Sequence, residues 1–308
     1  MSYNVPASFQ VKYNNNVKLR VQQMGNPLAS AVEWQYDKSA EKVKIKDLVG
    51  HTEAKEATDR HGRTEWGNRT YDGVWIPKPN ELYDGDLIDN ADQLATAISL
   101  TGTATMGAAA TINRAKIRRI LEGFYAPIIS GKEGTTITAF PGGNIIPVTA
   151  GGASGPQKMN TKKLREANKF LSAGHAGEAG ERFTVLTADD NDALLTEVPA
   201  TSSDFKAAYG GVVEDGKLIK LLGWNFIHLE LDNQLLTTIP DLSTDSSGYR
   251  KTPFWVKPGL RVNEWEGLRS EVGKIPELRF SMGYLAGTTL AASRTEPEMS
   301  GIILNEKG

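Results

Sequence analysis

The stretch at residues 101–124, TGTATMGAAATINRAKIRRILEGF, constrains the fold more than any other part of this chain. It contains no proline, and it passes from small residues to a basic and apolar segment, which predicts one extended helix. At about 1.5 Å per residue this helix would span about 36 Å. The small residues at 107–110 would allow another element to pack close to the helix backbone.

An apolar stripe runs along one side of this predicted helix, and a basic group lies beside it. We predict that the stripe is core; its members are Met106, Ala110, Ile117, Ile120, Leu121 and Phe124. The basic group comprises Arg114, Lys116, Arg118 and Arg119. A solvated face or ion pairs between subunits explains this group more simply than DNA readout. No aromatic residues interleave with it, so it predicts no platform for base stacking.

The totals of the chain exclude several classes of site. It has 308 residues, a formal net charge of -2 and no cysteine. Disulfides, thiolate zinc sites and cysteine nucleophiles are therefore ruled out, and a reducing cytosol fits this composition. The first residues lack the basic-then-apolar pattern of a signal peptide, and no apolar run approaches the roughly 18 residues of a membrane span. We expect no membrane partner.

Residues 29–80 predict a projecting hairpin. The segments EKVKIKDLVG and RTYDGVWIP alternate as strands do, and the polar stretch HTEAKEATDRHGRTEWGN separates them. Such a hairpin is marginally stable alone in water, and its outer part has too few apolar residues for a core. It therefore needs another surface to lie against. Residues 1–28 indicate an arm rather than a compact unit.

Three further helices are predicted. Residues 82–99 favour a helix with Asp86 or Asp89 as its cap. Residues 160–174 favour an amphipathic helix that begins after Asn160 and ends at Gly174. Residues 182–197 indicate a strand, a turn and a short helix, with Asp189 or Asp190 as its cap.

The remaining segments indicate strands. Residues 134–148 are interpreted as a hairpin, and so are residues 210–231, which turn at Asp215-Gly216. Further strands are expected near residues 254–267, 276–291 and 300–306. Because strands and helices do not alternate regularly, the predicted class is α+β with segregated elements.

The sequence contains no complete catalytic or metal-binding motif. A phosphate-binding loop fails around Gly131-Lys132, because Glu133 stands where Ser or Thr is needed. The segment ADDNDALL lacks the glycine and glutamate of a calcium loop. The four histidines, which are His51, His61, His175 and His228, do not stand at metal-ligand spacing. We therefore predict no catalytic, metal or cofactor-binding residue and no enzymatic activity.

The ordered set of motifs resembles the major capsid proteins of tailed bacteriophages. The motifs that carry the resemblance are VQQMGNPLASAVE (21–33), GDLIDNADQLATAI (85–98), GAAATINRAKIRRILEGF (107–124), KEGTTITAFP (132–141) and RFTVLTADDNDALL (182–195). Their order and spacing fit along essentially the whole chain. The resemblance implies the Hong-Kong-ninety-seven type of fold, which tailed phages and herpesviruses share.

The resemblance also implies a division into four parts. Residues 1–30 would be the N-terminal arm and residues 31–80 the extended loop. Residues 81–181 and 262–308 would form the peripheral domain, with the long helix as its spine. Residues 182–261 would form the axial domain, which meets its copies around the five-fold and six-fold axes.

The implied function is self-assembly, as hexamers and pentamers, into the icosahedral shell around a double-stranded DNA genome. The implied contact of the extended loop with a neighbouring subunit involves His51, Glu53, Lys55, Glu56, Asp59, Arg60, His61 and Arg63. Implied partners are other copies of the chain, a portal, a cement or decoration protein, and packaged DNA bound non-specifically. Because the chain starts at Met1 almost directly in the arm, we expect a separate scaffolding protein. Assembly would take place in the host bacterial cytoplasm, and the product would be the virion capsid.

Two other classes of function stay open at this stage. The first is a nucleic-acid-binding module that uses the basic helix at residues 114–119, and it predicts a monomer whose DNA affinity depends on salt. The second is an enzyme whose site is assembled from scattered carboxylates, and it predicts a concave pocket with perturbed titrations.

Overall fold

The computed structural model describes residues 25–38, 40–50, 52–56, 63–64, 66–67, 69, 71–88, 100–152, 155–197, 211–231, 243–278 and 281–307. These residues belong to two compact units. The described residues of the smaller unit fall in the segments Met1–Asn26, Asn80–Lys116 and Glu266–Thr289, and those of the larger unit in Pro27–Pro79, Ile117–Trp265 and Leu290–Gly308. This division differs from the four predicted parts, which stay a prediction.

Three long elements contribute residues to both units. They are the helix α2 (Leu100–Tyr125) and the strands β13 (Leu260–Ile275) and β14 (Ser281–Arg294). The single helix predicted for residues 101–124 is confirmed to within one residue at each end.

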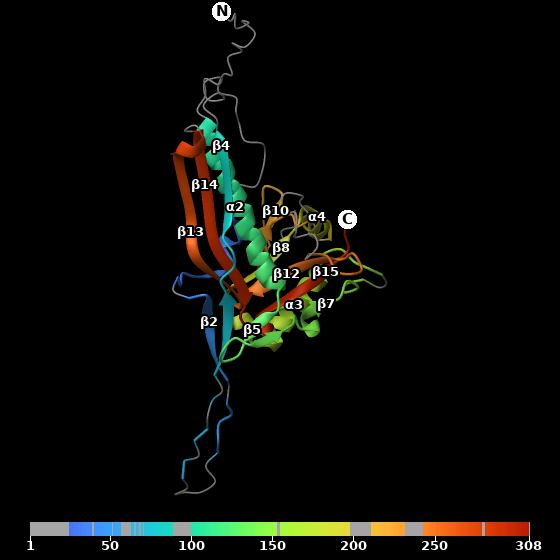
Figure 1. Cartoon of the computed structure of the whole chain (residues 1–308). Coiled ribbons are helices and arrows are strands. Elements are labelled where there is room, and N and C mark those ends of the chain that lie inside the picture. The colour runs from blue at the N-terminus through green and yellow to red at the C-terminus, as the bar shows by residue number, and fades with distance from the viewer. Residues whose placement is uncertain are drawn as a thin grey trace, which may run out of the picture. The chain divides into compact units, whose positions relative to one another are not determined.

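The smaller unit is a sheet packed against the first part of α2. Strand β4 (Leu82–Ile88) pairs antiparallel with β14, from Met282↔Ile88 to Thr288↔Leu82, and β13 lies on the other side of β14. Figure 1 shows these strands side by side. Ala108 and Ile112 of α2 pack against Ala286 of β14 in a small buried cluster.

The helix predicted for residues 82–99 is wrong over residues 82–88, which form β4. A cap at Asp86 would stabilise only the first turn of a helix. The β-ladder with β14 supplies hydrogen-bond partners for backbone groups along the whole strand, and the strand therefore forms instead of the helix. The Asp86 side chain instead accepts a hydrogen bond of 2.8 Å from the backbone N–H of Leu87. Asp89 and the rest of that segment to residue 99 lie outside the described residues.

The larger unit centres on a seven-stranded sheet in the order β7-β15-β12-β8-β11-β10-β9. Its strands are β7 (Ile145–Ile146), β8 (Arg182–Leu186), β9 (Val212–Glu214), β10 (Lys217–Leu221), β11 (Trp224–His228), β12 (Arg250–Val256) and β15 (Ser300–Asn305). The Asp215-Gly216 turn predicted between β9 and β10 is confirmed, and both residues have positive φ, as a tight hairpin turn requires.

Alternation along β12 divides the core of this unit between the two faces of the sheet. Phe254 and Val256 belong to one buried cluster, while Trp255 belongs to another. The Trp255 cluster contains the last turns of α2 and the 3-10 helix η2 (Pro27–Ser30). The other cluster contains apolar residues of α3 (Thr161–Ala173) and α4 (Ala188–Glu197).

Helix α3 confirms the predicted capping. The Asn160 side chain accepts a hydrogen bond of 2.9 Å from the backbone N–H of Lys163, and Gly174 ends the helix. The strand and short helix predicted for residues 182–197 are confirmed as β8 and α4. The predicted cap needs correction, because the Thr187 hydroxyl accepts from the backbone N–H of Asp190.

A four-stranded sheet, β2-β3-β5-β6, carries the hairpin. The predicted strands are confirmed as β2 (Lys42–Val49) and β3 (Tyr71–Pro77), which pair antiparallel. The base of the hairpin has a core that includes Trp265 and Ile128. Beside it, β1 (Glu33–Gln35) pairs in parallel with β13, and Glu33 accepts two hydrogen bonds of 2.8 Å from Arg261.

The hairpin predicted for residues 134–148 is wrong. Strand β6 (Thr136–Thr138) pairs with β5 (Ile128–Ser130), while β7 pairs in parallel with β15. Gly131 and Gly134 have positive φ and form the turn between β5 and β6. The other 3-10 helices of the described residues are η3 (Gly142–Asn144), η4 (Ala176–Glu178), η6 (Lys257–Gly259), η7 (Pro276–Leu278) and η8 (Pro297–Met299). The α+β class is confirmed.

Candidate functional site

The last turns of α2 are the most deeply buried part of the helix. Of the predicted stripe, Ala110 is 1% exposed, and Ile117, Ile120, Leu121 and Phe124 are 0% exposed. The Phe124 ring lies 5.8 Å from that of Trp255, centroid to centroid. This end of the helix is therefore fixed to the seven-stranded sheet by aromatic and aliphatic packing.

Met106 corrects the predicted stripe, because its side chain is 53% exposed. In the smaller unit the helix contacts its sheet through Ala108 and Ile112, which are each at most 2% exposed. Met106 precedes Ala108 by two residues and so projects from roughly the opposite side of the helix. The buried face near the start of α2 is therefore displaced from the stripe that the sequence indicated.

At Gly123, α2 packs closely against β14. A Cβ atom built on Gly123 would lie 2.6 Å from the carbonyl carbon and 2.8 Å from the Cβ of Ala292. The sequence predicted close packing at residues 107–110, but it did not single out Gly123. The glycine allows the helix backbone to rest directly on the strand.

The basic residues of α2 are half-buried and have partners within the chain. Arg118 Nε donates to Glu122 Oε1 at 2.8 Å, and a nitrogen of Arg119 lies 3.9 Å from Glu122 Oε2. Arg114 donates to the Thr111 hydroxyl at 3.0 Å. Two of the basic side chains thus share one carboxylate, which reduces the positive charge that this face presents.

The outer hairpin, defined here as residues 51–70, is exposed wherever it is described. Of the predicted contact residues, Glu53, Lys55, Glu56 and Arg63 are exposed, while His51, Asp59, Arg60 and His61 lie outside the described residues. Sequence reasoning missed Trp66, whose side chain is 88% exposed. The sequence feature that could have identified Trp66 is its position as the sole large apolar residue of a polar stretch.

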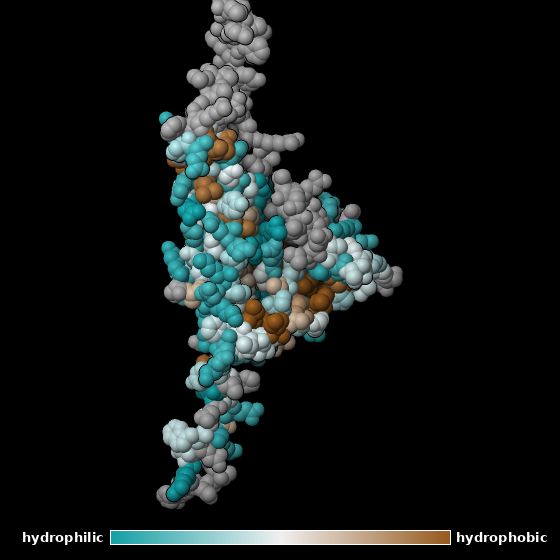
Figure 2. All heavy atoms as spheres, in the orientation of Figure 1, coloured by the Kyte–Doolittle hydropathy of each residue, from teal (hydrophilic) through white to brown (hydrophobic). Residues whose placement is uncertain are grey.

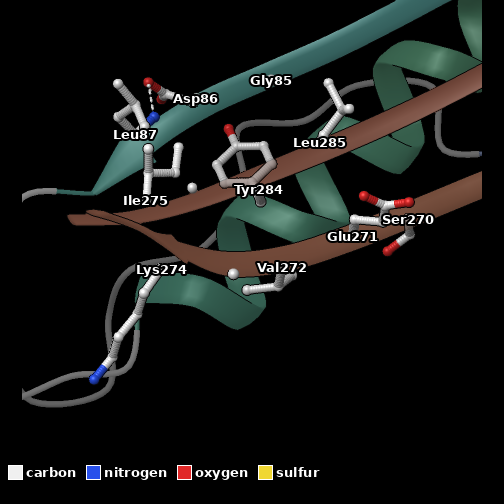
Figure 3. A pocket seen from close by; sticks show the side chains of 12 residues that line it. Gly85, Asp86, Leu87, Ser270, Glu271, Val272, Lys274, Ile275, Tyr284 and Leu285 are labelled. Atoms are coloured by element: carbon white, nitrogen blue, oxygen red, sulfur yellow. Dashed lines mark hydrogen bonds between the residues drawn. The ribbon is translucent and has the colours of Figure 1, made fainter. Parts of the chain in front are cut away.

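A hollow of about 780 Å³ lies in the smaller unit between β4, β13 and β14. Figure 3 shows Tyr284, Leu87 and Ile275 among the side chains around it. Burial raises the pKa of the Tyr284 phenol, and the negative charges of Asp86 and Asp84 raise it further. The phenol therefore stays a neutral hydrogen-bond donor at ordinary pH.

A buried ionic cluster joins α3 and α4 to the seven-stranded sheet. Lys163 Nζ donates to the carbonyl oxygens of Gln157 and Leu304, at 2.6 and 2.7 Å. Burial lowers the pKa of Lys163 to about 8. Arg250 of β12 lies 3.2 Å from a carboxylate oxygen of Asp190, and burial raises the pKa of Asp190 although Arg250 opposes this shift. Nothing in the sequence distinguished these charged residues from solvated ones.

Neither a metal site nor a membrane span is found among the described residues. They contain no group of three or more His, Asp or Glu side chains placed to hold a metal ion. No helix in the described part of the chain is both long and apolar enough to cross a membrane. The visible surface in Figure 2 is largely hydrophilic or neutral, with apolar residues gathered in separate patches.

The long helix, the hairpin and the sheets together form the fold of tailed-phage capsid proteins. The capsid structure of Cyanophage P-SCSP1u superposes with a TM-score of 0.70 at 11% identity, covering 98% of this chain and 94% of the other. The capsid of Ralstonia phage GP4 gives a TM-score of 0.69 at 11% identity, with 100% and 98% covered. The capsid of an empty GTA particle gives 0.64 at 11% identity, with 99% and 98% covered.

The sequence itself identifies the family. Residues 5–307 match the family model described as phage capsid protein, and the chain therefore belongs to that family. A comparison with curated proteins gives no significant match. The chain is thus a structural component of a phage virion, and the alternative of a nucleic-acid-binding module built on residues 114–119 is not supported.

Proposed function

We propose that this chain is the repeating subunit of an icosahedral shell, in which it forms hexamers and pentamers around a double-stranded DNA genome. It performs no catalysis in this role. The observation that carries the proposal is the β2–β3 hairpin, whose base has a buried core while its described outer residues are all exposed. A neighbouring copy would supply the surface that the outer hairpin lacks.

The energetics of the hairpin support this interpretation. Four residues at the base, which are Val43, Ile45, Val74 and Ile76, are each 2% exposed. An isolated two-stranded hairpin is marginal in water, so the outer part gains little from its own contacts. Head-to-tail contacts between identical subunits close into rings when the rotation between them is right. Such contacts would make the outer hairpin stable only within the assembly.

The predicted four-part division belongs to the same proposal. Residues 1–30 would be the arm, 31–80 the extended loop, 81–181 and 262–308 the peripheral domain, and 182–261 the axial domain. A separate scaffolding protein, a portal and a cement or decoration protein would be further partners, and the subunits would assemble in the host cytoplasm. Packaged DNA would touch the shell through phosphates without base readout.

Replacing residues 51–66 with a flexible Gly-Ser linker tests this proposal. The variant should keep the unfolding midpoint of the unassembled wild-type subunit, because the core of the hairpin base is untouched. It should fail to form closed shells by electron microscopy. Thr52→Ala, which changes one exposed side chain of the same segment outside the predicted contact residues, is the matched control and should assemble. Normal shells from the linker variant would contradict the proposal.

A further inference from the structure

Trp66 differs from every other tryptophan of the chain. The chain has 6 tryptophans, of which Trp224, Trp255 and Trp265 are at most 4% exposed, and Trp34 and Trp75 are partly buried. Trp66 is 88% exposed, on the outer hairpin. A tryptophan side chain buries about 150–250 Å² when it is covered. A tryptophan that stays in water therefore loses a large favourable free energy of burial. Its exposure indicates an anchor for another surface.

A pocket of about 230 Å³ lies at the other end of the same hairpin, where β3 meets the end of α2. We call it the hairpin-base pocket. Its apolar walls come chiefly from Pro77, Pro79, Ala126, Pro127 and Ile129. A cavity of about 150 Å³ already accepts a benzene molecule, so this pocket has room for an aromatic ring.

The polar groups of the hairpin-base pocket match an indole. Arg119 and Glu122 of α2 also line the pocket, and a guanidinium nitrogen of Arg119 lies 3.9 Å from the Oε2 atom of Glu122. A guanidinium group over an indole face is a favourable cation–π contact. A buried indole N–H also needs an acceptor, which the Glu122 carboxylate supplies. Proline walls, one cation and one acceptor together form an environment that suits a tryptophan side chain.

We propose that the Trp66 indole of one copy inserts into the hairpin-base pocket of a second copy of this chain. This inference rests on the proposed shell function and names the residues of the contact. In Figure 1 the described residues of the outer hairpin extend beyond β2 and β3, away from the rest of the larger unit. Trp66 and the hairpin-base pocket thus lie at opposite ends of one hairpin. A repeating head-to-tail contact needs this arrangement.

Tryptophan fluorescence of wild type and Trp66→Phe, before and after assembly, tests the inference directly. The difference between their signals reports Trp66 alone. In unassembled subunits the Trp66 emission obtained from this difference should be red-shifted and strongly quenched by iodide, because the indole is exposed. In assembled particles it should shift to the blue and lose most of its quenching. An indole that stays quenchable in closed shells would overturn the inference while leaving the shell function intact.

Substitutions test which surface receives the indole. Trp66→Ala should raise the subunit concentration needed for assembly about ten-fold or more, as loss of an interface anchor does. Ala126→Phe, which fills the pocket from an exposed position, should have a similar effect. Thr64→Ala, an exposed neighbour of Trp66, is the control and should assemble as wild type does.

The double variant of Trp66→Ala and Ala126→Phe should need no higher subunit concentration for assembly than either single variant, because both substitutions remove the same contact. Additive effects would show that the indole binds elsewhere and would overturn the assignment of the pocket. Unassembled subunits of all variants should keep the wild-type unfolding midpoint. A wild-type chain that never assembles would instead refute the proposed function itself.

Discussion

Replacing Gly123 with alanine tests whether α2 truly rests on the backbone of β14. In a free helix this change is favourable, because alanine exceeds glycine in helix propensity by about 0.8–1 kcal/mol. In this chain the added Cβ would lie 2.6 Å from the carbonyl carbon of Ala292. Propensity and packing therefore predict effects of opposite sign.

The packing effect should prevail. The atom that the new methyl group meets is backbone, so no side chain can rotate away, and the helix and the strand must separate. Overpacking of this kind typically costs about 1–3 kcal/mol, and the buried Phe124 next to Gly123 limits how far the helix can move. A contact with rigid backbone belongs to the upper part of that range, about 2–3 kcal/mol, so after subtracting the propensity gain we expect the free energy of unfolding to fall by about 1–2 kcal/mol.

Urea unfolding of the unassembled subunit provides the assay, with the midpoint compared at equal slope. Gly142→Ala is a suitable control, because a Cβ at Gly142 has nothing within 4 Å and should change stability little. A Gly123→Ala variant that is as stable as wild type, or more stable, would refute the close contact between helix and strand.

Two further perturbations follow from the charged residues. Changing Arg118 and Arg119 to Gln should weaken assembly more than it lowers the DNA content of each finished particle, because Arg119 lines the hairpin-base pocket. Both arginines also pair with Glu122 of the same chain, which reduces the charge that they offer to DNA. Light scattering and absorbance of purified particles measure this, and normal shells with markedly less DNA would contradict it. Burial holds the pKa of Lys163 at about 8, below its usual 10.5, so the unfolded chain binds more protons between these values. This group therefore makes stability rise as pH increases from about 8 to 10.5, and Lys163→Met should remove that part of the slope in urea unfolding, whereas an unchanged slope would refute it.

Local signals in the sequence were sufficient where short-range chemistry decides the structure. The side chain of Asn160 caps α3, and Asp215-Gly216 forms a turn, because both depend on neighbouring backbone groups. The apolar period of α2 likewise predicted its burial from Ile117 onward. These features involve residues that are close in the chain.

Pairings between distant segments could not be predicted in the same way. Residues 82–88 carry a plausible helix cap, yet they form a strand because β14 lies beside them. Met106 fits the apolar period of α2, yet the sheet contacts Ala108 and Ile112 instead. The functional surface was harder still, because the exposure of Trp66 becomes informative only once the hairpin that carries it is known.

Electron microscopy of the purified chain at high concentration is the decisive test of the proposed shell function. The proposed shell function predicts rings of five and six subunits and closed shells built from them. The linker variant of the outer hairpin, prepared in parallel, should give single folded subunits. A wild-type chain that stays as single subunits, both alone and together with the proposed scaffolding protein, would contradict the proposed shell function.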